Sequence, residues 1–182
     1  MKLNENERNI CIMILWLNGT YGVGKTTIAY KIVEKYNKTS KVFDPDLLWK
    51  QTIKKNPMMI FGDGAYPRDN KRFLKILIDS INQIIKEYNG LIIVPMTIVN
   101  EEALKNIQCA IDVRIKHIVL LANEDVIRQR VEIQEKTSSE KRDLSMLKND
   151  LVYLNNNFIN DDKIDTTYRK VEDIAEDIIR FL

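Results

Sequence analysis

The chain has 182 residues, of which 30% are charged, and its 28 basic and 26 acidic residues give a formal net charge of +2. This length suffices to bury a core without disulfides or a structural metal, so we expect one domain over residues 1–182. The balanced charge and the lack of a basic stripe exclude nucleic acid as an expected partner. No apolar run approaches the roughly 20 residues of a membrane-spanning helix, so at most peripheral contact with a membrane is expected.

Cysteine usage and the first residues of the chain predict a cytoplasmic protein. Cys11 and Cys109 form no C-x-x-C pair, and we interpret both as buried thiols in a reducing compartment. The N-terminal residues lack the pattern of a secretory signal. No heptad or exposed apolar stripe indicates an oligomeric state, which stays unknown.

The first predicted strand, residues 10–17, leads directly into a glycine-rich loop. The loop fits the pattern G-x-x-x-x-G-K-[ST] and is followed by apolar residues at helical spacing, which predict a helix over 25–37. Glycines in such a loop let backbone N–H groups point towards phosphate oxygens, and the helix N-terminus adds positive potential. We therefore expect ATP to contact Gly19, Thr20, Tyr21, Gly22, Val23, Gly24, Lys25, Thr26 and Thr27.

Two side chains of this phosphate loop (residues 19–26) are expected to carry separate chemistry. Lys25 is predicted to reach the β- and γ-phosphates and to act in catalysis. The hydroxyl of Thr26 is predicted to ligate Mg²⁺, a hard cation that takes oxygen ligands. The expected cofactors are therefore ATP and Mg²⁺.

Two carboxylates follow the second predicted strand, residues 41–44. Phosphoryl transfer to a hydroxyl requires a carboxylate that orients the nucleophile and accepts its proton, and often a further acid that supports Mg²⁺. Asp44 and Asp46 are the candidates, and Asp44, nearer the strand end, is the preferred base and metal ligand. In the alternative interpretation Asp46 caps the helix that follows and Asp44 begins a turn before Pro45.

Residues 57–67 interrupt the helical pattern between predicted helices over 46–56 and 67–88. Apolar and aromatic residues there are compatible with a cap over a small-molecule acceptor, about residues 46–72. In the alternative interpretation these side chains fill the hydrophobic core. Two arginines at the start of the second helix are placed where they can approach an anionic acceptor. The predicted acceptor-binding residues are Asp44, Asp46, Phe61, Tyr66, Arg68, Arg72 and Thr97.

The third predicted strand, residues 91–95, ends in Pro95-Met96-Thr97 and carries no acid. P-loop enzymes commonly place an acid behind Mg²⁺ at this point. Metal support is therefore expected from Thr26 together with Asp44 or Asp46. Thr97 is a candidate for a hydrogen bond to phosphate or substrate, although a threonine at a strand end is usually structural.

The second half of the chain repeats the alternation of strands and helices. Helices are predicted over 101–112, 124–135 and 140–156, strands over 115–121 and 163–166, and a closing helix from Val171. His117 falls inside a strand and is interpreted as a core residue. The five predicted strands alternating with helices indicate an α/β fold of three layers, with a parallel sheet covered by helices on both faces.

The polar segment after the fourth strand is predicted to form a mobile lid, about residues 130–143. Small kinases must exclude water from the transferred phosphoryl group, and cations on a closing segment also stabilise the transition state. Arg130 is the predicted lid residue in contact with ATP and in catalysis. Lys136, Lys141 and Arg142 are further candidates, or members of a solvated charged surface.

Three blocks of the sequence together resemble the tunicamycin resistance protein family: Trp16–Thr26, Val42–Asp46 and Leu91–Val99. The resemblance implies an ATP-binding protein with a nucleoside- or shikimate-kinase-like fold, similar in architecture to chloramphenicol phosphotransferase and shikimate kinase. It also implies resistance to a nucleoside antibiotic, with Asp44 at the position that faces the acceptor hydroxyl. The lid departs from related kinases, since residues 131–134 after Arg130 supply no second arginine.

Three functions are open at this stage. The first is an ATP-dependent phosphotransferase that acts on a hydroxyl of a small molecule, such as a nucleoside antibiotic. The second is a protein that binds ATP and sequesters the drug without chemistry, for which the Asp44/Asp46 pair has no evident use. The third is a metabolic nucleoside or nucleotide kinase, for which Arg68 and Arg72 would hold a phosphate.

Overall fold

The computed structural model describes residues 12–36, 38–61, 66–137 and 143–182, and Cys11, Lys141 and Arg142 lie outside these ranges. Its five strands form one parallel sheet in the order β2-β3-β1-β4-β5, which confirms the predicted α/β fold. The strands are β1 (Met13–Asn18), β2 (Ser40–Val42), β3 (Leu91–Pro95), β4 (Arg114–Leu121) and β5 (Asp162–Asp165).

The central strand β1 is buried on both faces, as expected for a sheet covered by helices on both sides. Alternate side chains point to opposite faces of the strand, so Leu15 and Leu17 belong to one apolar cluster and Ile14 and Trp16 to the other. Trp16 is fully buried, and its indole N–H donates to the carbonyl of Met96 at 3.1 Å. The two clusters fix the register of the sheet, because a shift by one residue would exchange the faces.

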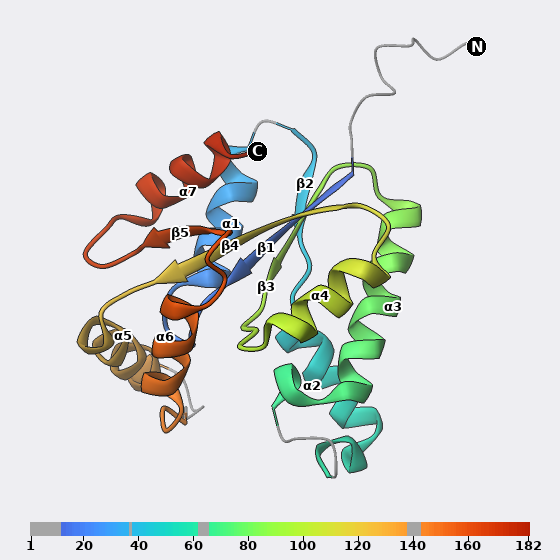
Figure 1. Ribbon diagram of the computed structural model, residues 1–182, viewed down its shortest axis with the longest axis horizontal. Helices are drawn as coiled ribbons and strands as arrows, with labels where there is room; N and C mark the ends of the chain where they lie inside the picture. The colour runs from blue at the N-terminus through green and yellow to red at the C-terminus, as the bar shows by residue number, and fades with distance from the viewer. Residues whose placement is uncertain (1–11, 37, 62–65, 138–142) are drawn as a thin grey trace.

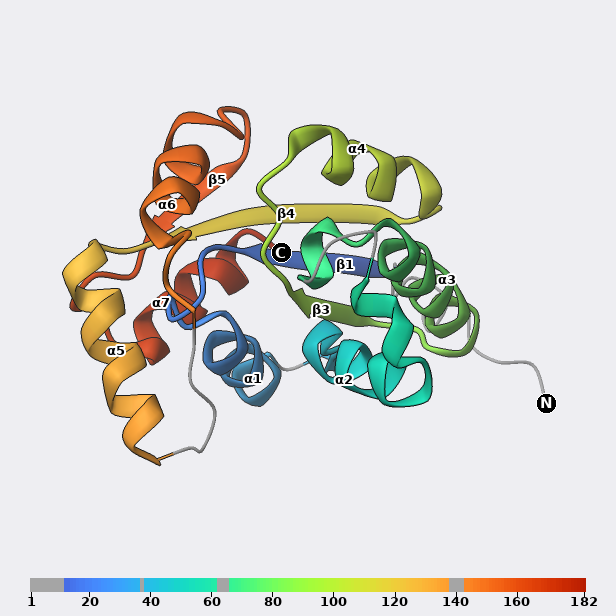
Figure 2. The ribbon, with the colours of Figure 1, turned by 90° about the horizontal axis from the view of Figure 1, so that it is seen from below.

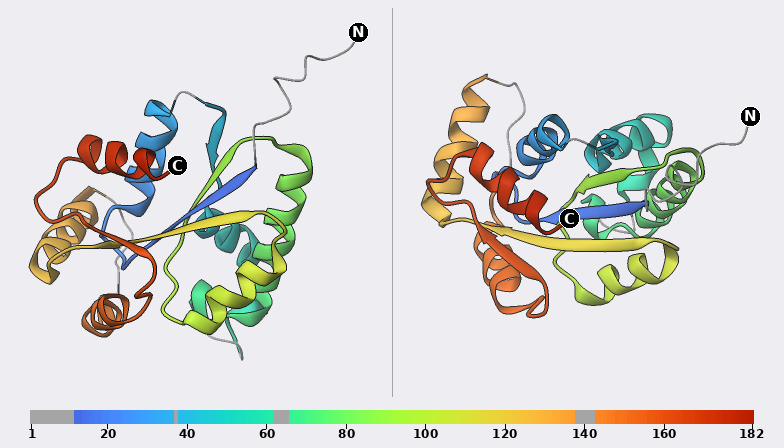
Figure 3. Two further views of the ribbon diagram at one scale, coloured as in Figure 1. Left: turned by 45° about the horizontal axis from the view of Figure 1, so that its top comes forward. Right: turned by 90° about the horizontal axis from the view of Figure 1, so that it is seen from above.

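Helices cover the two faces in separate pairs (Figures 1 and 3). On one face α1 (Lys25–Lys35) packs against α7 (Val171–Arg180), and on the other α3 (Lys71–Glu87) lies beside α4 (Glu101–Ala110). The remaining α-helices, α2 (Pro45–Lys55), α5 (Glu124–Thr137) and α6 (Leu147–Asn156), lie towards the edge where the strands end. Figure 2 looks onto this edge, with α2 and α5 on opposite sides of α1.

Two predicted helices begin later than the sequence pattern suggested. Residues 67–69 form a 3₁₀ turn, η3 (Pro67–Asp69), and α3 starts after Asn70, whose side chain accepts the N–H of Phe73 at 2.9 Å. The predicted helix 140–156 begins only at Leu147, because Asp143 accepts the N–H of Ser145 at 2.8 Å in a local turn that competes with the helix. A second 3₁₀ turn, η2 (Pro57–Ile60), follows α2.

One expectation about the cysteines is wrong. Cys109 lies near the end of α4 and is exposed, since the apolar positions of this helix that face the sheet are Leu104 and Ile107. Within the described part of the chain, no helix combines the length and the apolar composition needed to cross a membrane.

Candidate active site

The phosphate loop joins the end of β1 to the start of α1, and its glycines adopt backbone conformations that other residues rarely reach. Gly19, Gly22 and Gly24 have φ values of +146°, +77° and +104°. A Cβ atom on Gly22 would lie 2.7 Å from the side chain of Val131, and one on Gly19 would lie 2.7 Å from the carbonyl oxygen of Leu120. The loop can therefore pack against β4 and α5 only with glycine at these two positions.

Lys25 is the first residue of α1, and its ammonium group turns back over the loop. Its Nζ atom donates to the carbonyl oxygens of Gly19 at 3.0 Å and Thr20 at 2.9 Å. Burial lowers the pKa of Lys25 to about 8, while the negative charge of Asp46 acts in the opposite direction. An ammonium group held by these two carbonyls, at a helix N-terminus, is placed to exchange those contacts for anionic oxygens.

The residues present fit the triphosphate of ATP. Within the described residues, the hydroxyl of Thr20 is buried without a hydrogen-bond partner, so a donor or acceptor in the loop is still to be satisfied. Thr26 is exposed directly beside Lys25 and presents a hydroxyl, an oxygen ligand of the kind that Mg²⁺ takes. The two hydroxyl groups and the glycine conformations are therefore compatible with an anionic ligand that binds together with a hard cation such as Mg²⁺.

A buried polar network fixes the first residue of the loop. The Oδ1 atom of Asn18 accepts the N–H groups of Gly19 at 2.7 Å and Ile98 at 2.9 Å, and its Nδ2 donates to the Ile98 carbonyl. The same Nδ2 lies 3.1 Å from Nε2 of His117, so this ring nitrogen is the acceptor and the proton resides on Nδ1, which lies 3.1 Å from the carboxylate of Asp161. Burial lowers the pKa of His117, although Asp161 opposes the effect, which agrees with a neutral ring.

His117 is buried within β4, as its interpretation as a core residue requires, but its contact with Asn18 gives it a second role. The sequence offered no signal for this network, because Asn18, Ile98 and His117 are separated by at least 19 residues. They meet because β1 pairs with β4, which carries His117, and with β3, which Ile98 follows.

Two further side chains hold the loop from outside. The hydroxyl of Thr97 donates to the carbonyl of Gly19 at 2.7 Å, so this strand-end threonine supports the loop and also lines the cavity described below. Arg130 donates to the carbonyl of Val23 at 3.3 Å and to the carbonyl of Thr166 at 2.7 Å. The structure places Arg130 within α5, where it links the loop to the end of β5 and is not among the residues that line the cavity. Its contact with ATP stays a prediction.

The structure gives Asp44, the predicted base, a structural role. Asp44 is the N-cap of α2, and its Oδ1 atom accepts the N–H groups of Asp46 at 2.9 Å and Leu47 at 3.3 Å. The proximity of Pro45 favours this role, since proline at the first helical position leaves the cap to bind the next N–H groups. Asp46, in the first turn of α2, lines the cavity and is near enough to Lys25 to influence its pKa.

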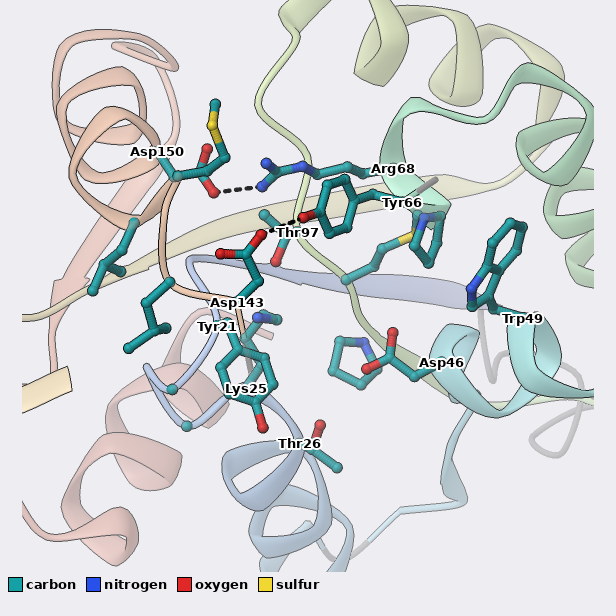
Figure 4. Close-up of a pocket in the computed structure, with 18 of the residues that line it drawn as sticks. Tyr21, Lys25, Thr26, Asp46, Trp49, Tyr66, Arg68, Thr97, Asp143 and Asp150 are labelled. Carbon is teal, nitrogen blue, oxygen red and sulfur yellow. Dashed lines mark hydrogen bonds and ion pairs between the residues drawn. The ribbon is translucent and has the colours of Figure 1, made fainter. Parts of the chain in front are cut away.

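A cavity of about 720 Å³ opens above the loop, between α2 and η3 on one side and α6 with the end of the α5–α6 connection on the other (Figure 4). Two contacts cross it. The hydroxyl of Tyr66 donates to Asp143 at 2.7 Å, and Arg68 donates to Asp150 at 2.5 Å. The hydrogen bond from Tyr66, with a second from the N–H of Ser145, lowers the pKa of Asp143 to about 2.

Most of the residues predicted for the site line this cavity: Tyr21, Gly22, Gly24, Lys25, Thr26, Thr27, Asp46, Tyr66, Arg68 and Thr97. The loop residues Gly19, Thr20 and Val23 lie in the same turn but are covered by their neighbours.

Three other predicted residues lie elsewhere. Phe61 is 62% exposed, and Arg72 is exposed on α3, so the structure brings neither into the cavity lining. Lys136 pairs with Glu132 along α5 at 2.9 Å and belongs to the solvated surface. The described part of the predicted lid is thus the second half of α5 together with Asp143.

Several lining residues were not predicted from the sequence, namely Trp49, Lys50, Asp143 and Asp150. Asp150 sits in the first turn of α6, where an acid is favoured by the helix dipole in any protein. Its position in the sequence therefore gives no sign that it lines the cavity and contacts Arg68, 82 residues away.

The sheet order and the phosphate loop define a P-loop protein. A family model described as an AAA domain matches residues 14–149, and the chain belongs to this family. No curated protein matches the sequence significantly.

Solved structures share the fold over nearly the whole chain. The tunicamycin resistance protein of Deinococcus radiodurans matches with a TM-score of 0.71 and 23% identity, covering 92% of this chain and 94% of that one. A gluconokinase from Sinorhizobium meliloti 1021 matches with a TM-score of 0.62 and 14% identity, over 91% and 89% of the two chains. Shikimate kinase from Acinetobacter baumannii, in complex with shikimate, matches with a TM-score of 0.56 and 14% identity, over 92% and 91%. The resemblance inferred from the three sequence blocks is therefore borne out in the fold.

Proposed function

We propose that the chain is an ATP-dependent phosphotransferase that transfers the γ-phosphoryl group to a hydroxyl of a small molecule, with a nucleoside antibiotic such as tunicamycin as the first candidate acceptor. One observation carries the proposal. A single cavity joins the phosphate loop, with Lys25 and Thr26, to the carboxylate of Asp46 and to a wall of aromatic and polar side chains beyond it. The similarity to the Deinococcus radiodurans tunicamycin resistance protein supports the choice of acceptor.

The residues of the chain divide the work of the reaction. Lys25 releases the carbonyls of Gly19 and Thr20 and binds the phosphate oxygens, while the loop N–H groups hold the remaining charge. Magnesium, held by the hydroxyl of Thr26 and supported by Asp46, would neutralise charge on the transferred group.

Asp46 orients the acceptor hydroxyl and accepts its proton as the oxygen attacks phosphorus and the bond to the leaving β-phosphate oxygen breaks. We prefer Asp46 over Asp44 because the carboxylate of Asp44 already binds two backbone N–H groups of α2. Asp46 is also exposed to the cavity, where an acceptor can reach it.

The test is mass spectrometry of tunicamycin and a panel of hydroxylated compounds after incubation with the protein and MgATP. We expect one compound to gain the mass of a phosphoryl group. Asp46→Asn should keep ATP binding and lose transfer by at least about 100-fold, the size expected for a general base.

Asp44→Asn is the matched control, because asparagine caps a helix as well as aspartate does and should leave most of the transfer intact. Loss of transfer in Asp44→Asn with full activity in Asp46→Asn would contradict the assignment of the base. Tight, ATP-dependent retention of tunicamycin without any mass change would contradict transfer itself and favour sequestration.

A further inference from the structure

The acceptor side of the cavity contains an ion pair that the reaction does not use. Nη1 of Arg68 lies 2.5 Å from Oδ2 of Asp150, and the two side chains are only 15% and 10% exposed. Both residues line the cavity, and their contact spans it from η3 to α6 (Figure 4). A charge that is largely withdrawn from water is tolerated when its partner is held in place, so each residue depends on the other.

This pair changes what the cavity can attract. A free arginine at this position would favour an anionic acceptor, which is what the sequence suggested for Arg68. In the structure the positive charge of Arg68 is already compensated from inside the cavity by Asp150. An anionic acceptor would have to displace the carboxylate of Asp150 or lie beside it, and either costs free energy.

The other charges of the lining point the same way. Its cations are Lys25, Lys50 and Arg68, and its acids are Asp46, Asp143 and Asp150. Lys25 lies against the phosphate loop and is assigned to the nucleotide. Asp46 is assigned to magnesium and to proton transfer. The charged side chains that remain for an acceptor are therefore two cations and two acids, which carry no net positive charge.

The uncharged residues of the cavity lining can pack against a ring of the acceptor. Trp49 lines the cavity from α2 and Tyr66 from the position before η3, and the apolar residues Met96 and Leu147 line it as well. The ring of an acceptor can pack against these aromatic and apolar side chains. Its hydroxyl groups can form hydrogen bonds with the carboxylates and the guanidinium group beside them.

We propose that the acceptor is an uncharged, hydroxyl-bearing ring compound of the sugar or nucleoside class, and that the Arg68–Asp150 pair is the determinant that disfavours anionic acceptors. The proposal rests on the proposed function in that the acceptor enters this cavity. Acceptor hydroxyls would donate to the carboxylate of Asp150 and accept from the guanidinium group of Arg68. The pair therefore offers a neutral ligand both a hydrogen-bond acceptor and hydrogen-bond donors.

The test compares two ligands of the same shape that differ in charge, shikimate and its methyl ester. Calorimetric titrations use the full chain saturated with Mg²⁺ and ADP, so that neither ligand binds in the phosphate loop. Wild-type protein should bind the acid no more tightly than the ester. Asp150→Asn, which keeps the shape but removes the charge, should shift the ratio of the two affinities towards the acid by at least about tenfold.

The double variant Arg68→Met with Asp150→Asn is the matched control, since it lacks both charges and should return the ratio to the wild-type value. Unchanged affinity for ADP in each variant verifies that the fold is intact. A wild-type preference of tenfold or more for the acid would overturn the proposal, as would an Asp150→Asn variant that gains no affinity for shikimate.

These outcomes are separate from the fate of the proposed function. A protein that phosphorylates tunicamycin but prefers the acid overturns the charge selection alone. A protein with the expected preference that phosphorylates no compound of the panel overturns the transfer reaction alone.

Discussion

Two parts of the cavity are held in place by different kinds of contact. We call the phosphate loop (residues 19–26) its floor, and the side chains of Tyr66, Arg68, Asp143 and Asp150 its far wall. The phosphate loop is held by hydrogen bonds with side chains near the ends of β1 and β3, namely the buried Asn18 and the partly buried Thr97. The far wall depends on two side-chain contacts, Tyr66 with Asp143 and Arg68 with Asp150, each between segments far apart in the sequence. The same nucleotide-binding loop can therefore be kept in many proteins. Substitutions in the far wall, by contrast, can change which acceptor is bound without altering the loop.

The largest expected effect of a single substitution is on the floor. Lys25→Ala removes the only side-chain cation of the phosphate loop, and charge-assisted hydrogen bonds are worth about 1.5–3 kcal/mol. We therefore expect the affinity for ATP, measured by calorimetry, to fall by about tenfold to 100-fold, and transfer to fall further.

Lys105→Ala is the control for Lys25→Ala, because Lys105 is an exposed residue of α4 on the other face of the sheet. It should bind ATP as the wild type does. Nearly unchanged ATP affinity in Lys25→Ala would mean that the nucleotide does not use this loop.

The next effect concerns the support of the floor. Asn18→Ala leaves the buried N–H groups of Gly19 and Ile98 without their acceptor, and each such loss costs about 1–3 kcal/mol. We expect the free energy of unfolding to fall by at least that amount in urea titrations, with a weaker affinity for ATP. Asn106→Ala, at an exposed position of α4, should change neither quantity. An Asn18→Ala variant with wild-type stability would show that water replaces the side chain.

The contrast between floor and wall also explains what the sequence could predict. The spacing of glycines, Lys25 and Thr26 is local, so the loop was identified from eight consecutive residues. The parallel sheet followed from alternating apolar runs. Asp150 and Asp161 look like ordinary acids of a helix and a turn, and their partners lie 82 and 44 residues away. The cap role of Asp44 was not separable from a catalytic role by sequence, because a helix cap and a catalytic acid use the same residue type at the same strand end.

The pH dependence of ATP binding gives a sharper test of the floor than a deletion. The pKa of Lys25 is about 8 without nucleotide, and a bound triphosphate would raise it by its negative charge. Between these two values binding takes up a proton, so affinity should fall with rising pH, by at most about tenfold per unit. Calorimetry in buffers of different ionisation enthalpy measures this uptake directly.

Lys25→Arg separates the charge of Lys25 from the rest of the loop, because arginine stays protonated over this range. Its weaker binding of ATP should lose the proton uptake near pH 8 to 9. If the uptake persists in Lys25→Arg, another group is responsible for it.

The smallest expected effect is on the wall. Tyr66→Phe removes the hydroxyl that donates to Asp143 but keeps the aromatic ring in the cavity. Both residues are exposed, so we expect the KM for the acceptor to rise by no more than about fivefold, while the KM for ATP is unchanged. Because the tyrosine hydrogen bond is the main cause of the low pKa of Asp143, the same variant should raise that pKa, which NMR titration of the carboxyl carbon can follow.

A raised pKa without any change in KM would mean that this contact joins the two sides of the cavity without shaping the acceptor site. A change in the KM for ATP would instead show that the floor and the wall are coupled.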